Sequence, residues 1–193
     1  MPTPKEQVEA GLNTIKYLTG VSQADFDTLK TVAAETHDWG PAVAVAFYDT
    51  LFAHNRTAAV FHEGERPIRE ESLTGWYHSL FKVDNEDDFW RNQIIIGFHH
   101  IRRHTNNEYM IGMAHKVRLI FRDNIVKTLG CERGLEVSAA FDRIMDTVVG
   151  LTAEIYDAMS NVAFSESTGT SQALLDMLIQ ESVDEIQEQV LGQ

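Results

Sequence analysis

Apolar residues recur every three or four positions along most of the chain, which is the pattern of amphipathic helices. In the first such segment, residues 6–18, Val8, Leu12 and Ile15 fall on one face. The same periodicity predicts further helices over residues 22–35, 42–54, 68–81, 88–104, 108–129, 132–164 and 172–192. No stretch alternates apolar and polar residues convincingly, so we expect an all-α protein.

Several residues at the ends of these segments favour helix boundaries. Ser22 suits an N-cap with acidic residues behind it, and Pro41 suits the first turn of the next helix. Asn106 and Asn107 indicate a break, and Gly130 suits the left-handed residue that ends a helix. Residues 54–67 are expected to be a looser connection.

The last part of the chain has its own pattern. Residues 165–171 (SESTGTS) predict a short polar linker. Residues 172–193 then predict an amphipathic helix whose apolar face holds Leu175, Ile179, Val183, Ile186 and Val190. This helix is expected either to fold back on the body or to pair with another chain.

Composition and charge narrow the function. The 193 residues suit one domain with a substantial core, and the formal charge of −13 argues against nucleic acid or an anionic membrane as partner. The single cysteine, Cys131, cannot form an internal disulfide, which favours a reducing compartment. With no secretory signal and no long apolar run, a cytoplasmic protein is expected.

Residues 95–104 (IIGFHHIRRH) crowd three histidines behind an apolar run. Ile96 and His100 share one helical face, where partial burial favours the neutral imidazole that a metal requires. Spacing alone favours a structural, partly buried histidine over a ligand. A zinc site of His99, His100 and His104 is weaker, because His99 projects about 100° away and nothing completes four ligands.

Four segments together resemble the protoglobin and globin-coupled sensor family. IGFHHIRRHTNNEYMIGM is similar to its proximal-histidine segment, AFYDTLF to its F-Y-x-x-L segment and ESLTGWYHSLF to its distal helix. KVDNEDDFWR resembles the acidic turn before the haem-binding helix, and all four occur in family order. The resemblance implies a globin fold over residues 1–164, with an extra leading helix within residues 1–20.

By the resemblance, His100 is the proximal axial ligand of haem iron, while Tyr48 is the distal tyrosine that can donate to bound dioxygen. Ser72 is a second distal donor. The sequence departs from the family after the histidine, at Arg103-His104-Thr105, which puts the end of that helix in question. The residues expected to form the pocket walls are Phe47, Phe61, Leu73, Trp76, Leu80, Ile96, Met113 and Val117.

The cofactor implied by the resemblance is haem b, held non-covalently because no Cys-x-x-Cys-His occurs. The basic residues around the expected pocket, among which the sequence does not choose a partner for the haem propionates, are Arg66, Arg69, Lys82, Arg91, Arg102 and Arg103. His78 is expected near the pocket rim rather than near the iron.

The function implied is reversible binding of dioxygen, carbon monoxide or nitric oxide, as an oxygen sensor domain in signal transduction and not as an enzyme. A homodimer through the last two long globin helices is expected, because the last one carries apolar residues on more than one side: Leu135, Ala139, Ile144, Met145, Val148, Val149, Ile155, Tyr156 and Met159. Two alternatives stay open: a globin acting in nitric oxide or nitrite redox chemistry, and a haem-free helical interaction module.

Overall fold

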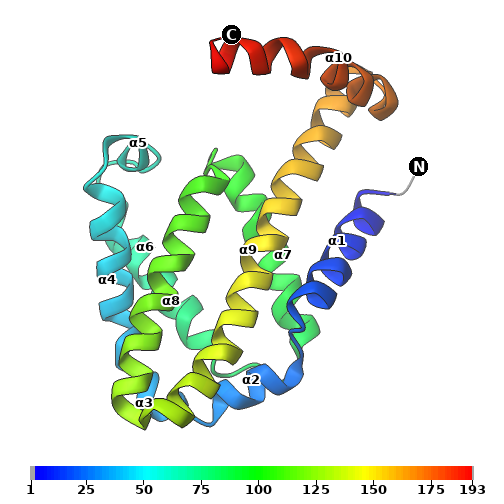
Figure 1. Cartoon of the computed structure of the whole chain (residues 1–193). Helices are drawn as coiled ribbons and strands as arrows, with labels where there is room; N and C mark the ends of the chain where they lie inside the picture. The colour runs from blue at the N-terminus through cyan, green and yellow to red at the C-terminus, as the bar shows by residue number, and fades with distance from the viewer. Residues whose placement is uncertain (1–2, 193) are drawn as a thin grey trace.

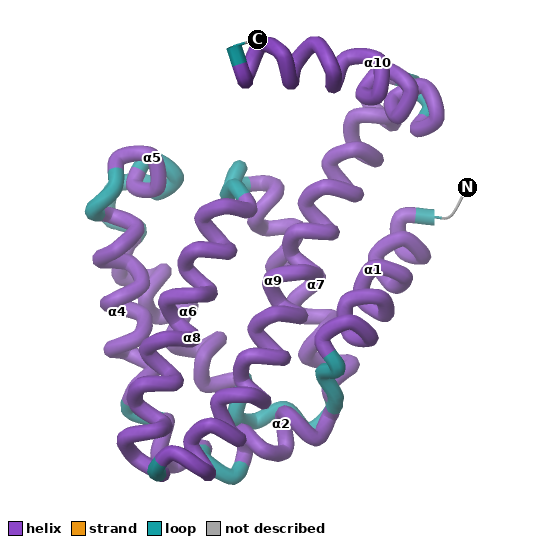
Figure 2. The backbone as a smooth tube through the Cα atoms, viewed as in Figure 1, coloured by secondary structure: helices purple, strands orange, loops and turns teal. Residues whose placement is uncertain are grey.

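A computed structural model describes residues 3–192, and all regular structure in that range is helical (Figures 1 and 2). The helices are α1 (Pro4–Thr19), α2 (Gln23–Lys30), α3 (Ala33–Thr36), α4 (Trp39–Phe52), α5 (Asn55–Ala58), α6 (Arg66–Ser79), α7 (Glu86–Arg102), α8 (Asn107–Leu129), α9 (Cys131–Thr168) and α10 (Gln172–Leu191). The all-α prediction is therefore confirmed. None of these helices is both long enough and apolar enough to cross a membrane.

Local signals explain where the main helices begin and end. The α1 helix starts with a capping box, in which the Thr3 hydroxyl and the Glu6 carboxylate accept from each other's backbone N–H groups, and it ends at left-handed Gly20. The α7 helix starts where the Asn85 side chain accepts from the backbone of Asp87, with three acidic residues in its first turn. These caps fix the entry points of two helices that pack on the core.

The long helix α9 is the centre of the body, and α8, α1, α7 and α2 pack against it. Figure 1 shows α1 and α8 on either side of α9, with α7 behind it. Ile144, Leu151 and Ile155 of α9 are completely buried, as is Phe141, whose ring stacks on Phe121 of α8 at 3.9 Å. The apolar residues on several sides of α9 are thus covered largely by helices of the same chain.

A second layer forms where α4 packs against α6 and α8. Here Tyr48, Leu51 and Met113 make a small buried cluster, separate from the main core, with Phe47, Phe61 and Leu73 packed against it. A cavity lies between this cluster and the helices α7 and α9.

Several boundaries differ from the sequence prediction. The segment 22–35 splits into α2 and α3, because the chain turns at Thr31 and Val32. The connection at 54–67 contains the short helix α5, and α6 begins before Ile68. The expected linker 165–171 is helical as far as Thr168, so only Gly169–Ser171 separate α9 from α10.

Helix α10 lies beyond the end of α9, apart from most of the body (Figure 1). Gly169 takes a left-handed conformation, with φ of 72°, and Ser171 caps the new helix by accepting from Leu174 N–H. No residue of α10 is buried. The chain therefore consists of a packed body and a protruding terminal helix.

Candidate functional site

A cavity of about 680 Å³ lies between α4, α6, α7, α8 and α9. Its wall is mainly apolar, and it contains nearly every residue that the sequence placed around a cofactor: Phe47, Tyr48, Phe61, Ser72, Leu73, Trp76, Ile96, His100, Met113 and Val117. Leu80 is the exception, since it is fully buried in the main core and does not line the cavity. Residues that are far apart in the sequence thus meet around one hollow.

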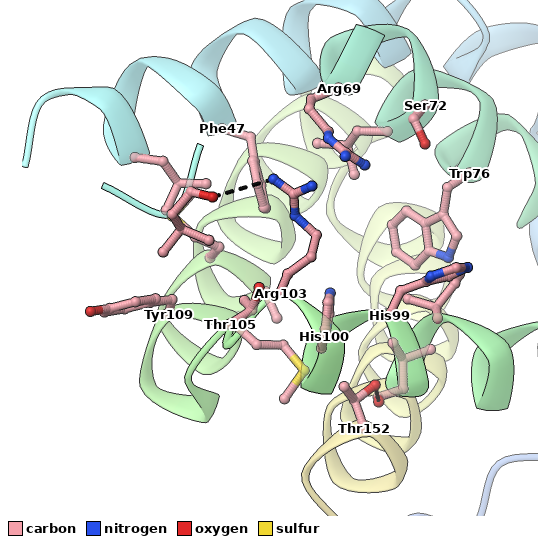
Figure 3. A pocket seen from close by; sticks show the side chains of 18 of the residues that line it. Phe47, Arg69, Ser72, Trp76, His99, His100, Arg103, Thr105, Tyr109 and Thr152 are labelled. Carbon is pink, nitrogen blue, oxygen red and sulfur yellow. Dashed lines mark hydrogen bonds between the residues drawn. The ribbon is translucent and has the colours of Figure 1, made fainter. Parts of the chain in front are cut away.

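His100 stands in the last turns of α7, one helical turn after Ile96, and faces the cavity (Figure 3). Its Nδ1 is covered and has no hydrogen-bond partner within the described residues. Burial, aided by neighbouring His99, lowers the pKa of His100, so the neutral ring is favoured. His99 also reaches the cavity wall, but its side chain is largely exposed.

Helices α7 and α9 approach closely at Gly97, which has no side chain to keep them apart. A Cβ at Gly97 would lie 3.0 Å from the Cδ1 atom of Ile155, which is completely buried on α9. A side chain at this position would require Ile155 to move by a few tenths of an ångström, so glycine lets the turn before His100 lie close to α9.

The structure shows how α7 ends at residues 103–105, where the sequence departs from the pattern that it otherwise resembles. His104 has a φ of 52°, the left-handed region that non-glycine residues rarely adopt. The backbone N–H of Thr105 donates to the His100 carbonyl at 3.0 Å, and the N–H of His104 donates to Ile101. The helix therefore ends tightly, two residues after His100.

Tyr48 lies in α4, buried among aromatic rings. The ring centroids of Phe47 and Phe61 are 5.1 Å and 5.7 Å from its own. Burial raises the pKa of Tyr48 to about 12, so its hydroxyl keeps its proton at neutral pH. That hydroxyl makes no hydrogen bond to another residue in the range 3–192, which leaves it available as a donor to a molecule in the cavity.

The structure divides the six basic candidates into two groups. Arg69, Arg102 and Arg103 line the cavity, whereas Arg66, Lys82 and Arg91 do not. Arg66 instead pairs with Asp49 and Glu70, each at 2.6 Å. His78 also lies away from the cavity, where its ring stacks on His37 at 4.3 Å.

Two of the lining arginines are braced by a carboxylate that the sequence analysis did not select. Glu65 accepts from Arg69 Nε at 2.8 Å and from Arg103 Nη2 at 2.7 Å. A hydrogen bond from the backbone of His62 and those from the two arginines lower the pKa of Glu65 to about 2. Arg103 also donates to the Val60 carbonyl at 3.2 Å, which ties the α5–α6 connection to the end of α7.

The sequence analysis also missed Gln93, which is 2% exposed and lines the cavity from α7. It accepts a hydrogen bond from Trp76 Nε1 at 3.3 Å and so fixes that ring from α6. Gln93 lies three residues before Ile96 and seven before His100, so helical register alone could have placed it on the same face.

The cavity suits a flat apolar group that offers one coordination position. It has a mainly apolar wall that is open on one side, a covered imidazole nitrogen without a partner among the described residues, and three arginines in its lining. By contrast, no three His, Cys, Asp or Glu residues within 3–192 lie together as ligands for a metal ion alone. The observed donors therefore fit haem.

The Protoglobin family model matches residues 8–161 of this chain. No match was found among curated proteins. The match begins within α1 and continues into α9, and it includes the segments that carry Tyr48 and His100. With an all-α fold and a family match over most of its length, the chain belongs to the Protoglobin family, a family of haem-binding globins.

Proposed function

We propose that the protein holds haem b non-covalently, with His100 as the axial ligand, and reversibly binds a diatomic gas as a sensor domain. The observation that carries this proposal is the half-buried His100 ring, whose covered Nδ1 has no hydrogen-bond partner among the described residues, on the wall of a mainly apolar cavity of about 680 Å³. When bound, haem b supplies an iron atom whose open coordination position accepts dioxygen, carbon monoxide or nitric oxide.

In this proposal the distal residue is Tyr48. Its protonated hydroxyl is a hydrogen-bond donor with no partner among the described residues, and the ring is buried among apolar and aromatic side chains. A donor here favours a ligand that gains partial negative charge, such as dioxygen, over carbon monoxide. Ser72, from α6, is a second donor on the wall.

The edge of the cavity supplies positive charge for the two carboxylates of haem. Arg69, Arg102 and Arg103 are the lining arginines, and planar guanidinium groups suit carboxylates. Glu65 already holds Arg69 and Arg103 in place, so their side chains are ordered before any ligand binds. This arrangement lowers the entropy lost on binding.

The test is reconstitution of the purified protein with hemin, followed by absorption spectroscopy. His100→Ala is expected to lose the Soret band of a ligated haem globin or to bind hemin far more weakly. His99→Ala, the adjacent and more exposed histidine, is the matched control and is expected to keep the spectrum. A His100→Ala spectrum identical to that of the parent protein would remove the proposal.

A second variant tests the distal role. Tyr48→Phe is expected to speed dioxygen release several-fold, because it removes a hydrogen bond of about 1 kcal/mol while keeping the ring. Stopped-flow measurement of the dissociation rate checks this, with Tyr17→Phe as the control because Tyr17 is 86% exposed. An unchanged dissociation rate would show that the phenol does not reach the ligand.

We also propose dimerisation through α8 and α9, although fewer apolar side chains are exposed for such an interface than the sequence suggested. Ile144, Met145, Val148, Ile155 and Met159 are buried inside the chain and do not require a partner. The support that remains is the exposure of four large apolar side chains on the two helices, Ile111, Leu119, Leu135 and Phe164.

A further inference from the structure

The uncovered apolar surface of this protein is concentrated on α10. Of the seventeen large apolar side chains that are exposed within residues 3–192, eight belong to this one helix: Leu174, Met177, Leu178, Ile179, Val183, Ile186, Val190 and Leu191. The helix has no buried residue and lies beyond the end of α9 (Figure 1). Leaving such a face in water is unfavourable, so a partner surface is expected.

Five apolar residues of α10 form one defined stripe, while its exposed side chains Leu174, Met177, Leu178 and Leu191 lie outside that stripe. Leu175, Ile179, Val183, Ile186 and Val190 follow at spacings of four, four, three and four residues. At about 100° per residue they fall within an arc of roughly 80° along the whole helix. The spacing is nearly the same in both directions from Val183, so the stripe matches itself when it is reversed.

The charges on α10 avoid the main part of this stripe. Glu181, Asp184, Glu185 and Glu188 lie on the opposite side of the helix, while neutral residues (Gln180, Ser182, Gln187 and Gln189) form the borders. Only Asp176 lies beside the stripe, near one end, where Gln172 donates to its carboxylate at 2.8 Å. No Lys or Arg occurs in residues 172–193.

We propose that the stripe of α10 binds the same stripe of a second copy of this chain in an antiparallel pair. With Val183 facing its counterpart, Ile179 faces Ile186 and Leu175 faces Val190. The neutral borders meet without charge repulsion, the acidic sides point outward, and the two Asp176 carboxylates lie at opposite ends. A positively charged partner is disfavoured, because the borders of the stripe carry few acidic side chains with which it could pair.

Oligomeric state gives the first test, on the full-length protein. Sedimentation velocity is expected to show that Val183→Lys weakens dimerisation at least tenfold even where α8 and α9 also touch in the dimer, because α10 exposes eight large apolar side chains and those two helices together expose four. Glu181→Gln, which changes the charge by the same amount on the opposite side, is expected to leave it unchanged or slightly stronger. Since each α10 carries five acidic residues, association is expected to strengthen as ionic strength rises.

Disulfide trapping tests the pairing itself, in a Cys131→Ser background because Cys131 is exposed. Val183→Cys is expected to cross-link efficiently under mild oxidation, while Glu181→Cys on the far side is not. Ile179→Cys alone is expected to cross-link poorly, but a mixture with Ile186→Cys protein forms the mixed dimer. Cross-linking of Ile179→Cys with itself would overturn the antiparallel arrangement.

A dimer that Val183→Lys leaves intact, with no preference between cysteines on the two sides of α10, would overturn the proposal. Dimerisation would then belong to another surface, such as α8 and α9. The inference does not depend on haem, and both measurements are expected to give the same result before and after reconstitution with hemin.

Discussion

The body and α10 are built from the same kind of amphipathic sequence but end in different environments. In the body, apolar residues on several sides of α9 find helices of the same chain, and the ring of Phe141, for example, stacks on Phe121. In α10, a stripe of similar periodicity remains in solvent. Periodicity thus shows that a helix has an apolar face. Only the tertiary structure shows whether other helices of the same chain bury that face.

Charge separates the two regions as well. Arg143 is the last basic residue of the sequence, and the fifty residues after it contain nine acidic residues and no Lys, Arg or His. The body is braced by ion pairs that join its helices, such as Arg143 Nε with Asp25 at 3.0 Å and Lys16 with Glu86 at 3.0 Å. Helix α10 has no basic residue with which to form ion pairs of this kind.

The largest effect on the body is expected from Gly134→Ala, in the first turn of α9. A Cβ there would lie 2.7 Å from the Val126 Cα atom and 3.1 Å from the Ile125 carbonyl oxygen. Because backbone atoms cannot move aside, the free energy of unfolding is expected to fall by about 2–3 kcal/mol. Urea denaturation measures this value.

Gly112→Ala is the control for Gly134→Ala. Gly112 lies in α8 with open space around its Cα, so alanine is expected to stabilise the helix by about 0.5–1 kcal/mol. Equal effects of the two substitutions would mean that the packing of α9 on α8 is looser than the structure indicates.

A smaller effect is expected from Glu65→Gln, at the brace of the cavity. The pKa of Glu65 lies below its value of about 4.5 in an unfolded chain. Its contribution is therefore fully present above that pH and is lost as pH falls toward about 2. Glu65→Gln is expected to lower the free energy of unfolding by about 1 kcal/mol at neutral pH.

The pH dependence is the decisive part of that measurement. The difference between Glu65→Gln and the parent protein is expected to shrink steadily below about pH 4.5, whereas Glu63→Gln, two residues earlier and exposed, is expected to change little at any pH. A constant difference down to pH 2 would exclude an ionic role for Glu65.

The smallest effect on the body is expected from deleting residues 172–193. Since no residue of α10 is buried, the free energy of unfolding is expected to change by less than about 0.5 kcal/mol. The absorption spectrum of the hemin-loaded protein is expected to stay the same. A lost Soret band would show that α10 is part of the globin fold.

Sequence alone predicted most of the helices, and nearly all of the residues that it placed around a cofactor line one cavity. The register of Ile96 and His100 gives one shared face, and Ser22 and Gly130, which the sequence marked as helix boundaries, cap α2 and α8. It did not predict the break between α2 and α3, where Thr31 ends a helix without a glycine or proline to signal it. The short helix α5 was missed because four residues hold too little periodicity to recognise.

The parts of the site that sequence did not predict depend on pairs of distant residues. Glu65 is unremarkable until the fold brings it between Arg69 and Arg103, the latter 38 positions away along the chain. Gln93 likewise gains its meaning from the Trp76 indole on another helix. Such hydrogen bonds arise from tertiary geometry, whereas the apolar wall follows from local periodicity.

One continuous helix, α9, runs from the cavity toward α10. Thr152 of α9 lines the cavity, and α9 continues without interruption for sixteen residues to Thr168. At 1.5 Å per residue this is a lever of about 24 Å, so a tilt of about 5° at Thr152 displaces its far end by about 2 Å. Gly97 brings the helix that carries His100 against Ile155, so α9 extends from this contact to the residues that precede α10.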